Sequence, residues 1–238
     1  MSLQYYHWQM KRINTILIFI LLFAGAFSVS AQQSAPAMQE KERILFTIHP
    51  LGGTAEYKDF GVVATDSGRV RFVIFETHVM GFDDIEKIYS NPSDLLALKV
   101  ERDINGWFGK ENIIENYNQN NYTVTIEKYK GKKKVNEQVL NTDGPIYNPV
   151  MVPLYPRSIP SLYIGWNLLF RIPKAFHVTL ASIDTIKVYG KTYQAYHFTS
   201  VPDKFEIWIN KDEPRIPLKI RGKGGFGYTL LMKEHSKN

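Results

Sequence analysis

Apolar and polar residues alternate along most of this chain, with apolar side chains at every second position. The alternation is clear at residues 70–74, 122–126 and 205–209. Successive side chains of a β-strand point to opposite faces of a sheet, so this period is typical of half-buried strands. No window of comparable length shows the spacing of an amphipathic helix. The pattern from residue 43 onward therefore predicts an antiparallel, all-β domain.

Short clusters of turn-forming residues separate the alternating runs, at residues 66–68, 105–106, 118–121, 130–132 and 189–191. Gly, Asn and Asp in such clusters favour the tight turns of β-hairpins. The strands are expected at residues 43–49, 54–64, 69–79, 83–90, 96–104, 111–117, 122–130, 133–140, 176–182, 184–189, 192–200, 204–210, 215–221 and 227–234.

One segment interrupts the alternation because it carries five prolines: Pro145, Pro149, Pro153, Pro156 and Pro160. Proline has no backbone N–H and cannot donate to a central ladder. We expect residues 141–165 to form a long crossover whose apolar side chains pack on the sheet, and residues 161–169 to form a helical turn or two. So many strands seldom remain flat. The predicted fold class is a large curved antiparallel sheet, curled or barrel-like, with a Pro-rich crossover and a short helical segment.

The first 31 residues have the three parts of a secretory signal peptide. Lys11 and Arg12 precede an apolar run at residues 13–29, and Val29-Ser30-Ala31 supplies small residues for cleavage. An uncleaved membrane anchor is the alternative interpretation. Met10, directly before the two basic residues, is an alternative initiator to Met1.

The signal defines the expected organisation of the chain. We predict a signal peptide at residues 1–31, a disordered lead-in at residues 32–42 and a single all-β domain at residues 43–235. The protein is expected in the periplasm, since no cysteine is present to carry a lipoprotein anchor. The same absence excludes disulfides, thiol nucleophiles and cysteine-ligated metals.

The charge of the chain is moderate. The formal value is +6, and about +4 once Lys11 and Arg12 leave with the signal. Such a charge favours solubility and suits peripheral contact with anionic membrane head groups, but it does not indicate a nucleic-acid partner.

No catalytic motif is present. The sequence contains no G-x-S-x-G, S-x-x-K or H-E-x-x-H pattern. Glu76 and His78 share one face of a strand, which is more typical of a surface pair than of a metal site. Asp83, Asp84 and Glu86 form an acidic cluster that we expect at solvated strand ends, because acid–base work requires burial. We therefore predict a protein that is not an enzyme and has no cofactor; a hydrolase with an unrecognised site is the remaining alternative.

Two basic segments are candidates for contact with phosphate groups. The first is a candidate membrane-facing basic tip around Gly131, which equally suits a charged turn that protects a sheet edge. Its residues are Lys128, Lys130, Lys132, Lys133 and Lys134. The second is the glycine-rich segment at residues 221–227. Because a strand pattern follows it where a phosphate loop would open a helix, we expect a hairpin turn there.

The C-terminal third resembles a known family. The strand Ile207-Trp208-Ile209, the segment Pro214-Arg215-Ile216-Pro217 and the pair Gly227-Tyr228 resemble the end of domain of unknown function family 3108, a family of exported Gram-negative envelope proteins. Residues 161–165 and 187–193 resemble two further segments of that family. The resemblance extends over residues 43–235 and its motifs lie within residues 160–232. It implies one exported β domain and supplies neither an activity nor catalytic residues. Trp208, Pro214, Arg215, Pro217 and Gly227 carry the resemblance and are expected to be structural.

Apolar residues occupy more positions than one buried face requires, as at the consecutive Val73, Ile74 and Phe75. A curled sheet has a concave face that such residues can line. We hypothesise a non-enzymatic module that binds an apolar ligand or lipid. The alternative is a structural or assembly protein that docks envelope partners through its sheet edges.

Overall fold

The computed structural model describes residues 39–106, 109–224 and 227–238. The predicted signal peptide, the candidate initiators and most of the lead-in lie outside the described residues. Within the described ranges, the backbone forms one antiparallel sheet of 14 strands, which confirms the predicted fold class. No helix in this part of the chain has the length and apolar character needed to cross a bilayer.

The strands follow one another with short turns, apart from a crossover that contains one 3₁₀ helix, η1. Their bounds are β1 (Glu42–His49), β2 (Thr54–Thr65), β3 (Gly68–Val79), β4 (Phe82–Ser90), β5 (Ala97–Gly106), β6 (Gly109–Asn118), β7 (Thr123–Lys130), β8 (Lys133–Asn141), η1 (Val152–Ser158), β9 (Asn167–Ile172), β10 (Lys174–Val188), β11 (Lys191–Val201), β12 (Phe205–Asn210), β13 (Pro217–Gly222) and β14 (Tyr228–Lys237).

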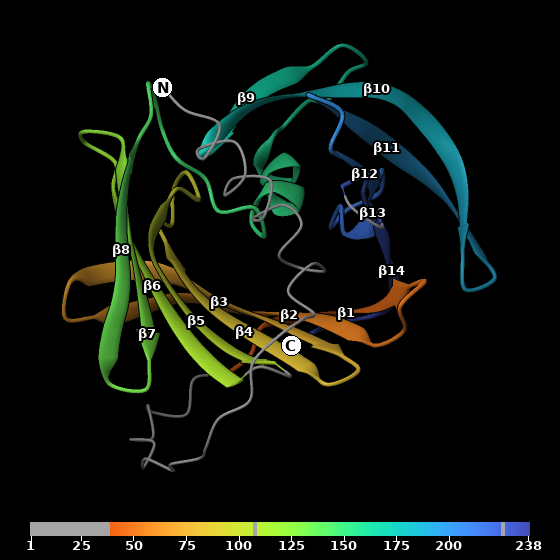
Figure 1. Cartoon of the computed structure of the whole chain (residues 1–238). Helices are drawn as coiled ribbons and strands as arrows, with labels where there is room; N and C mark the ends of the chain where they lie inside the picture. Colours follow the sequence, from red (N-terminus) through yellow and green to blue (C-terminus); the bar gives the residue numbers. More distant parts are fainter. Residues whose placement is uncertain (1–38, 107–108, 225–226) are drawn as a thin grey trace.

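The sheet is a meander whose two halves join through the first and last strands. Its order runs from β8 down to β1, then from β14 down to β9. Among the described strands, each therefore pairs with a neighbour in sequence, and β1 and β14 alone pair across a long stretch of chain. The sheet curls until its edge strands, β8 and β9, approach one another without closing a barrel (Figure 1).

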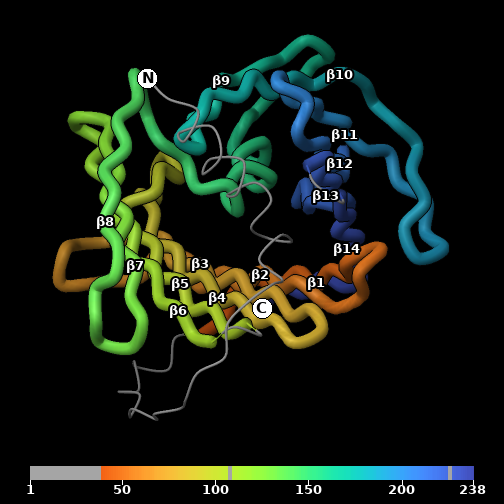
Figure 2. The backbone as a smooth tube through the Cα atoms, viewed as in Figure 1, coloured from red at the N-terminus to blue at the C-terminus, as the bar shows by residue number. Residues whose placement is uncertain are grey.

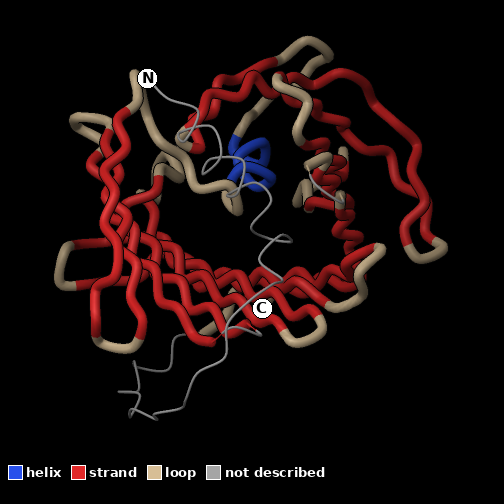
Figure 3. Tube along the Cα trace, viewed as in Figure 1, coloured by secondary structure: helices blue, strands red, loops and turns tan. Residues whose placement is uncertain are grey.

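The crossover between β8 and β9 runs through the inside of the curl, and η1 lies against the concave face (Figures 2 and 3). It also bridges the opening between the two halves. The Ile146 backbone pairs with Arg171 of β9, while the side chain of Gln119, in the β6–β7 turn, bonds both the N–H and the carbonyl oxygen of Ile146. The predicted crossover is thus confirmed.

The core lies between the concave face and the crossover. Ile44, Tyr57 and Phe75 are register partners on β1, β2 and β3, and all three are buried on this face. Met151 and Leu154 of the crossover pack in the same cluster. The alternation of apolar residues along each strand places one such residue per two positions in this core.

Two details of the sequence prediction were wrong. Residues 161–169 were expected to be helical, but the helix occupies Val152–Ser158, inside the proline-containing segment. β9 begins at Asn167, within the range that was expected to be helical. Proline suits the first turn of a helix because its fixed φ fits and its missing N–H is not needed there. The predicted strands 176–182 and 184–189 are one strand, β10. An irregularity between Leu180 and Ser182 interrupts the alternation of apolar and polar residues there, so the sequence pattern indicated two strands.

Candidate functional site

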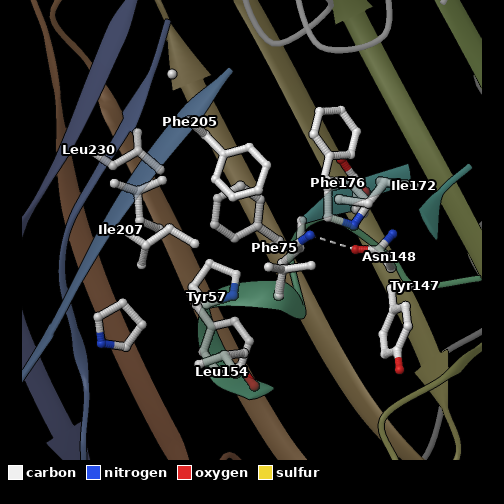
Figure 4. Close-up of a pocket in the computed structure, with 18 of the residues that line it drawn as sticks. Tyr57, Phe75, Tyr147, Asn148, Leu154, Ile172, Phe176, Phe205, Ile207 and Leu230 are labelled. Carbon is white, nitrogen blue, oxygen red and sulfur yellow. Dashed lines mark hydrogen bonds between the residues drawn. The ribbon is translucent and has the colours of Figure 1, made fainter. Parts of the chain in front are cut away.

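A cavity of about 180 Å³ lies between the concave face and the crossover. Tyr57 and Phe75 line it from β2 and β3, and Phe205, Ile207 and Leu230 from β12 and β14. Figure 4 shows these side chains converging on one space. Most of the lining is apolar, as the period-two pattern of the strands requires for their inner face.

The crossover forms the remaining wall. Val150, Val152 and Leu154 face the cavity. The Val150 N–H donates to the Asn148 Oδ1 at 2.8 Å, which closes a tight turn at the start of this wall. Tyr147, also in the lining, packs edge-on against Phe170 with ring centroids 4.8 Å apart.

Two arginines fasten this wall to the sheet. The Arg157 guanidinium of η1 donates to both carboxylate oxygens of Glu42, at 2.8 and 2.9 Å, and His235 Nε2 lies 2.9 Å from the same carboxylate. Arg215, between β12 and β13, donates to the carbonyl oxygens of Pro156, Ile159 and Pro160. The wall is therefore held in place by charge-assisted hydrogen bonds as well as by packing.

One side of the cavity is charged. Glu86, Arg102 and Glu115 are part of its lining. The Arg102 Nε lies 2.8 and 2.9 Å from the two carboxylate oxygens of Asp84. Burial lowers the pKa of Arg102, but the charges of Glu86 and Asp84 outweigh it and leave this pKa raised. The arginine stays charged and neutralises part of the acidic group.

This arrangement corrects the expectation that Asp83, Asp84 and Glu86 lie at solvated strand ends. Asp84 is buried and Glu86 lines the cavity, because Arg102 of the neighbouring strand reaches both. Asp83 fits the expectation better, since it is half-buried and lies 2.8 Å from His78 Nδ1 near the β3–β4 turn. Arg102, the partner of Asp84, lies eighteen residues further along the chain, so only the strand register reveals this pairing.

Three tyrosines of the cavity lining remain neutral phenols near neutral pH. Burial raises the pKa of Tyr228 and of Tyr147 to about 12, and it raises that of Tyr57 still further. Away from the charged side, these uncharged phenols and the apolar side chains form a lining that suits an apolar molecule.

The basic tip lies outside the cavity, at the β7–β8 hairpin. Lys128 pairs with Glu111 at 2.6 Å, and Lys134 pairs with Glu127 at 3.0 Å. The other three lysines of the group are exposed at the turn and the start of β8, which is an edge strand of the sheet; they are Lys130, Lys132 and Lys133.

The motif residues of the C-terminal third lie at strand ends and on the convex face. Trp208 is sandwiched between His197 and Lys219, each about 4.3 Å from its ring, and its Nε1 donates to Asp184 at 2.9 Å. Pro217 lies opposite Ile209 at an irregularity in the ladder, the kind of position that a proline requires.

The remaining motif residues lie in turns. Pro214 stands beside Arg215 in the turn between β12 and β13, and Gly227 has a φ of +66° where the chain enters β14. Sequence reasoning did not foresee that Arg215 anchors the wall of a cavity. Its partners are carbonyl groups, which leave no signal in the sequence.

Of the other sequence candidates, the pair Glu76 and His78 stays apart from the cavity, whereas Gly222 of the glycine-rich segment is part of its lining. The imidazole of His78 lies 3.7 Å from Glu76 at the surface, and the described residues contain no group of three or more His, Asp or Glu placed to hold a metal ion. The described residues of the glycine-rich segment, 221–224 and 227, lie at the end of β13 and directly before β14, and the Gly227 N–H donates to the Gly224 carbonyl at 2.9 Å.

Comparison with known proteins gives a family and a fold. The family described as "Protein of unknown function (DUF3108)" matches residues 62–233. Among curated proteins, no significant match is found. One similar solved structure is the crystal structure of a beta-barrel-like protein of domain of unknown function DUF1849 from Brucella abortus. It has 10% sequence identity and a TM-score of 0.51, and the match covers 84% of this chain and 98% of that chain. At this identity the likeness concerns the fold alone.

Proposed function

This chain belongs to the DUF3108 family of proteins of unknown function, and from its cavity we propose that it is an exported, non-enzymatic module that binds an apolar molecule such as part of a lipid. The observation that carries the proposal is the mostly apolar cavity between the concave face and the crossover. The signal-peptide pattern of residues 1–31 supports a periplasmic location for this binding.

The size of the cavity sets the size of the ligand. An apolar cavity of about 150 Å³ is enough to bind benzene, so about 180 Å³ holds a short apolar segment. Each methylene group that leaves water contributes about 0.8 kcal/mol. A fatty-acid chain of about a dozen carbons therefore binds with several methylenes inside the cavity and the rest outside it.

Native mass spectrometry tests the proposal directly. Protein recovered from the periplasm is expected to carry a mass adduct that organic extraction removes, and the stripped protein is expected to rebind added dodecanoate. Val150→Trp places an indole in the cavity and should abolish the adduct; Ile220→Phe fills it from the sheet side and serves if the first variant misfolds. Val139→Trp is the matched control, because Val139 is exposed on the edge strand β8.

A wild-type protein that shows only its bare mass and gains no adduct with dodecanoate would overturn the proposal. An adduct that survives in both cavity-filling variants would place the ligand elsewhere on the protein.

The two alternatives find less support. Docking of envelope partners through the sheet edges requires free edges, yet the Ile146 segment pairs with β9 and lysines stand on β8.

For a hydrolase, the nearest arrangement is Ser182, Asp184 and His197. Ser182 Oγ and Asp184 Oδ2 both approach Nδ1 of His197, at 3.3 and 3.2 Å. A nucleophilic relay needs them on opposite ring nitrogens. An esterase and glycosidase screen of the pure protein tests the hydrolase alternative.

A further inference from the structure

One end of the sheet combines exposed apolar turns, a group of lysines and strand ends that line the cavity, and we infer that this end docks on a bilayer containing anionic lipid. The inference rests on the proposed function, since docking would deliver an acyl chain from the membrane to the cavity. Consecutive antiparallel strands alternate in direction, so the β1–β2, β3–β4 and β7–β8 turns share this end with the last residues of β5 and the first residues of β6. We call it the docking end.

Apolar side chains protrude from two adjacent turns of the docking end. Met80, in the β3–β4 turn, is 80% exposed, and Leu51, in the β1–β2 turn, is 38% exposed. The β1–β2 turn lies against the end of β3, which leads into the other turn, because a Cβ on Gly53 would overlap the carbonyl oxygen of His78. Exposed residues of this size at hairpin tips lose contact with water when a surface of lipid covers them.

Lysines stand beside these turns at the same end. Lys110 opens β6, Lys130 closes β7, and Lys132 and Lys133 follow in the turn and on β8; all four are exposed. Lys130 and Lys133 are register partners, so the charges are concentrated at two neighbouring hairpins. In Figure 2 the β3–β4 tip (yellow) and the β7–β8 tip (green) both lie on the lower side of the view.

Acidic and basic side chains are mixed at the opposite end of the same strands. Asp66 lies between β2 and β3 with the exposed Arg69 close by, Asp94 lies between β4 and β5, and Asp143 after β8 pairs with Arg171 at 2.6 Å. An anionic lipid surface therefore attracts the docking end more strongly than the opposite end, which orients the molecule on the membrane. Charge complementarity therefore selects anionic lipid over a neutral surface as the partner.

The cavity reaches the docking end beside the β1–β2 turn. His49, the last residue of β1, pairs with Thr229 of β14, next to Tyr228. Tyr228 pairs with Gly222, and Gly222 pairs with Phe205. Tyr228, Gly222 and Phe205 all line the cavity. A bilayer that contacts Leu51 and Met80 therefore lies next to the ends of the strands that form the cavity wall.

Vesicle co-sedimentation of the protein recovered from the periplasm tests the inference. Binding is expected to vesicles in which about a quarter of the lipid is phosphatidylglycerol, and to fall with salt and in phosphatidylcholine alone. The triple variant K130E/K132E/K133E should weaken binding by at least a hundredfold, since each lysine near an anionic surface contributes roughly a fivefold gain in affinity. Met80→Ser should weaken it several-fold.

The controls carry the same changes away from the docking end. K187E/K191E/K211E has the same change in net charge at exposed positions on other hairpins, and Val139→Ser removes an exposed apolar side chain from β8. All variants share one N-terminal sequence, so differences between them report the docking end. Equal loss in both charge variants, or binding that ignores phosphatidylglycerol, would overturn the inference.

Dodecanoate binding without vesicles separates this result from the proposed function. The docking variants should still take up the fatty acid, because none of the changed residues lines the cavity. Failed docking with intact uptake overturns the inference alone, whereas failed uptake with intact docking overturns only the proposed function.

Discussion

Arg102 and Asp84 form a nearly buried pair on the concave face, with side chains 11% and 4% exposed. Glu86 lies 3.6 Å from the same guanidinium. Removing the arginine leaves carboxylates in the cavity wall without their counter-charge. We predict that Arg102→Met lowers the free energy of unfolding by about 3 kcal/mol near pH 7, as measured by urea denaturation.

A surface pair supplies the comparison for Arg102. Lys128 and Glu111 are partly exposed, so Lys128→Met is expected to cost under about 1 kcal/mol. Asp84→Leu added to Arg102→Met should restore part of the lost stability, because it removes one of the stranded charges. An Arg102→Met protein as stable as the wild type would show that the pair is solvated.

Glu42 makes the stability of the protein dependent on pH. Burial raises the pKa of its carboxyl group, but the hydrogen bonds and charges of Arg157 and His235 outweigh it, so the folded pKa lies below the ordinary value. A depressed carboxyl pKa contributes stability above the unfolded pKa, and this contribution disappears as the pH falls through the folded pKa. Acid should therefore weaken the interaction of Glu42 with Arg157, which holds η1 to β1.

Glu42→Gln tests this linkage. It is expected to lower stability by about 2 kcal/mol near pH 7, because a charged hydrogen-bond partner is lost, and to lower it by less near pH 3, below the ordinary carboxyl pKa. The measurement is the urea midpoint of both proteins at the two pH values. An equal difference at both values would mean that Glu42 is not the titrating group.

Single residues also show where sequence reasoning reaches its limit. Pro217 has no backbone N–H to donate to a regular ladder, and the structure accordingly places it at an irregularity in the β12–β13 ladder. Asp84 carries no such signal, because burial of a carboxylate depends on a partner from another strand. The lining of the cavity was likewise unpredictable, since it depends on which rows of residues the curl brings together.

At the scale of elements, the crossover is the segment that is not held to the sheet by a regular β-ladder. Arg215 donates to three carbonyl groups around η1, and without it these acceptors lose a charged donor. We predict that Arg215→Ala speeds hydrogen exchange at the Leu154 and Ile159 amides, which close the turns of η1, while the β2 and β3 amides stay protected.

Arg221→Ala is the control for that experiment, since Arg221 is 56% exposed on the adjoining strand and its ion pair with Glu206 is long, at 3.7 Å. Its exchange pattern should match that of the wild type. If η1 stays protected in Arg215→Ala, packing alone holds the wall of the cavity.

Most elements followed from local sequence, because hairpins pair neighbours and their turns carry Gly, Asn or Asp. The errors arose where local pattern and tertiary context differ. The irregularity near residue 181 divides β10 into two apparent strands, and the short β9 is recognisable only by its pairing with β10. The 3₁₀ helix was missed because prolines, which exclude a strand, were not also read as helix starters.

At the scale of the whole molecule, the first and last strands in chain order, β1 and β14, lie side by side in the middle of the sheet. The Asn238 N–H donates to the Lys41 carbonyl at 2.9 Å, and its Nδ2 donates to the Glu40 carbonyl at 3.2 Å. The β1–β14 ladder brings together residues such as Arg43 and Glu234, which lie 191 positions apart and whose side chains approach to 3.5 Å. All other ladders join sequence neighbours. This one pairing therefore gives the fold its long-range order, and sequence reasoning could not supply it because no turn signals it.

Circular permutation isolates the contribution of that ladder to folding speed. Joining Asn238 to Glu40 through a short Gly-Ser linker and opening the chain between Asp143 and Gly144 makes every ladder local. Opening it instead between Gly131 and Lys132 makes β1–β14 local but turns β7–β8 into a long-range ladder. Local contacts form at a smaller entropic cost, so the first permutant should fold several-fold faster than the natural chain, and the second should not. Stopped-flow tryptophan fluorescence measures both rates. Equal acceleration would assign the effect to the linker, whereas no acceleration in either would mean that closure of the β1–β14 seam does not limit folding.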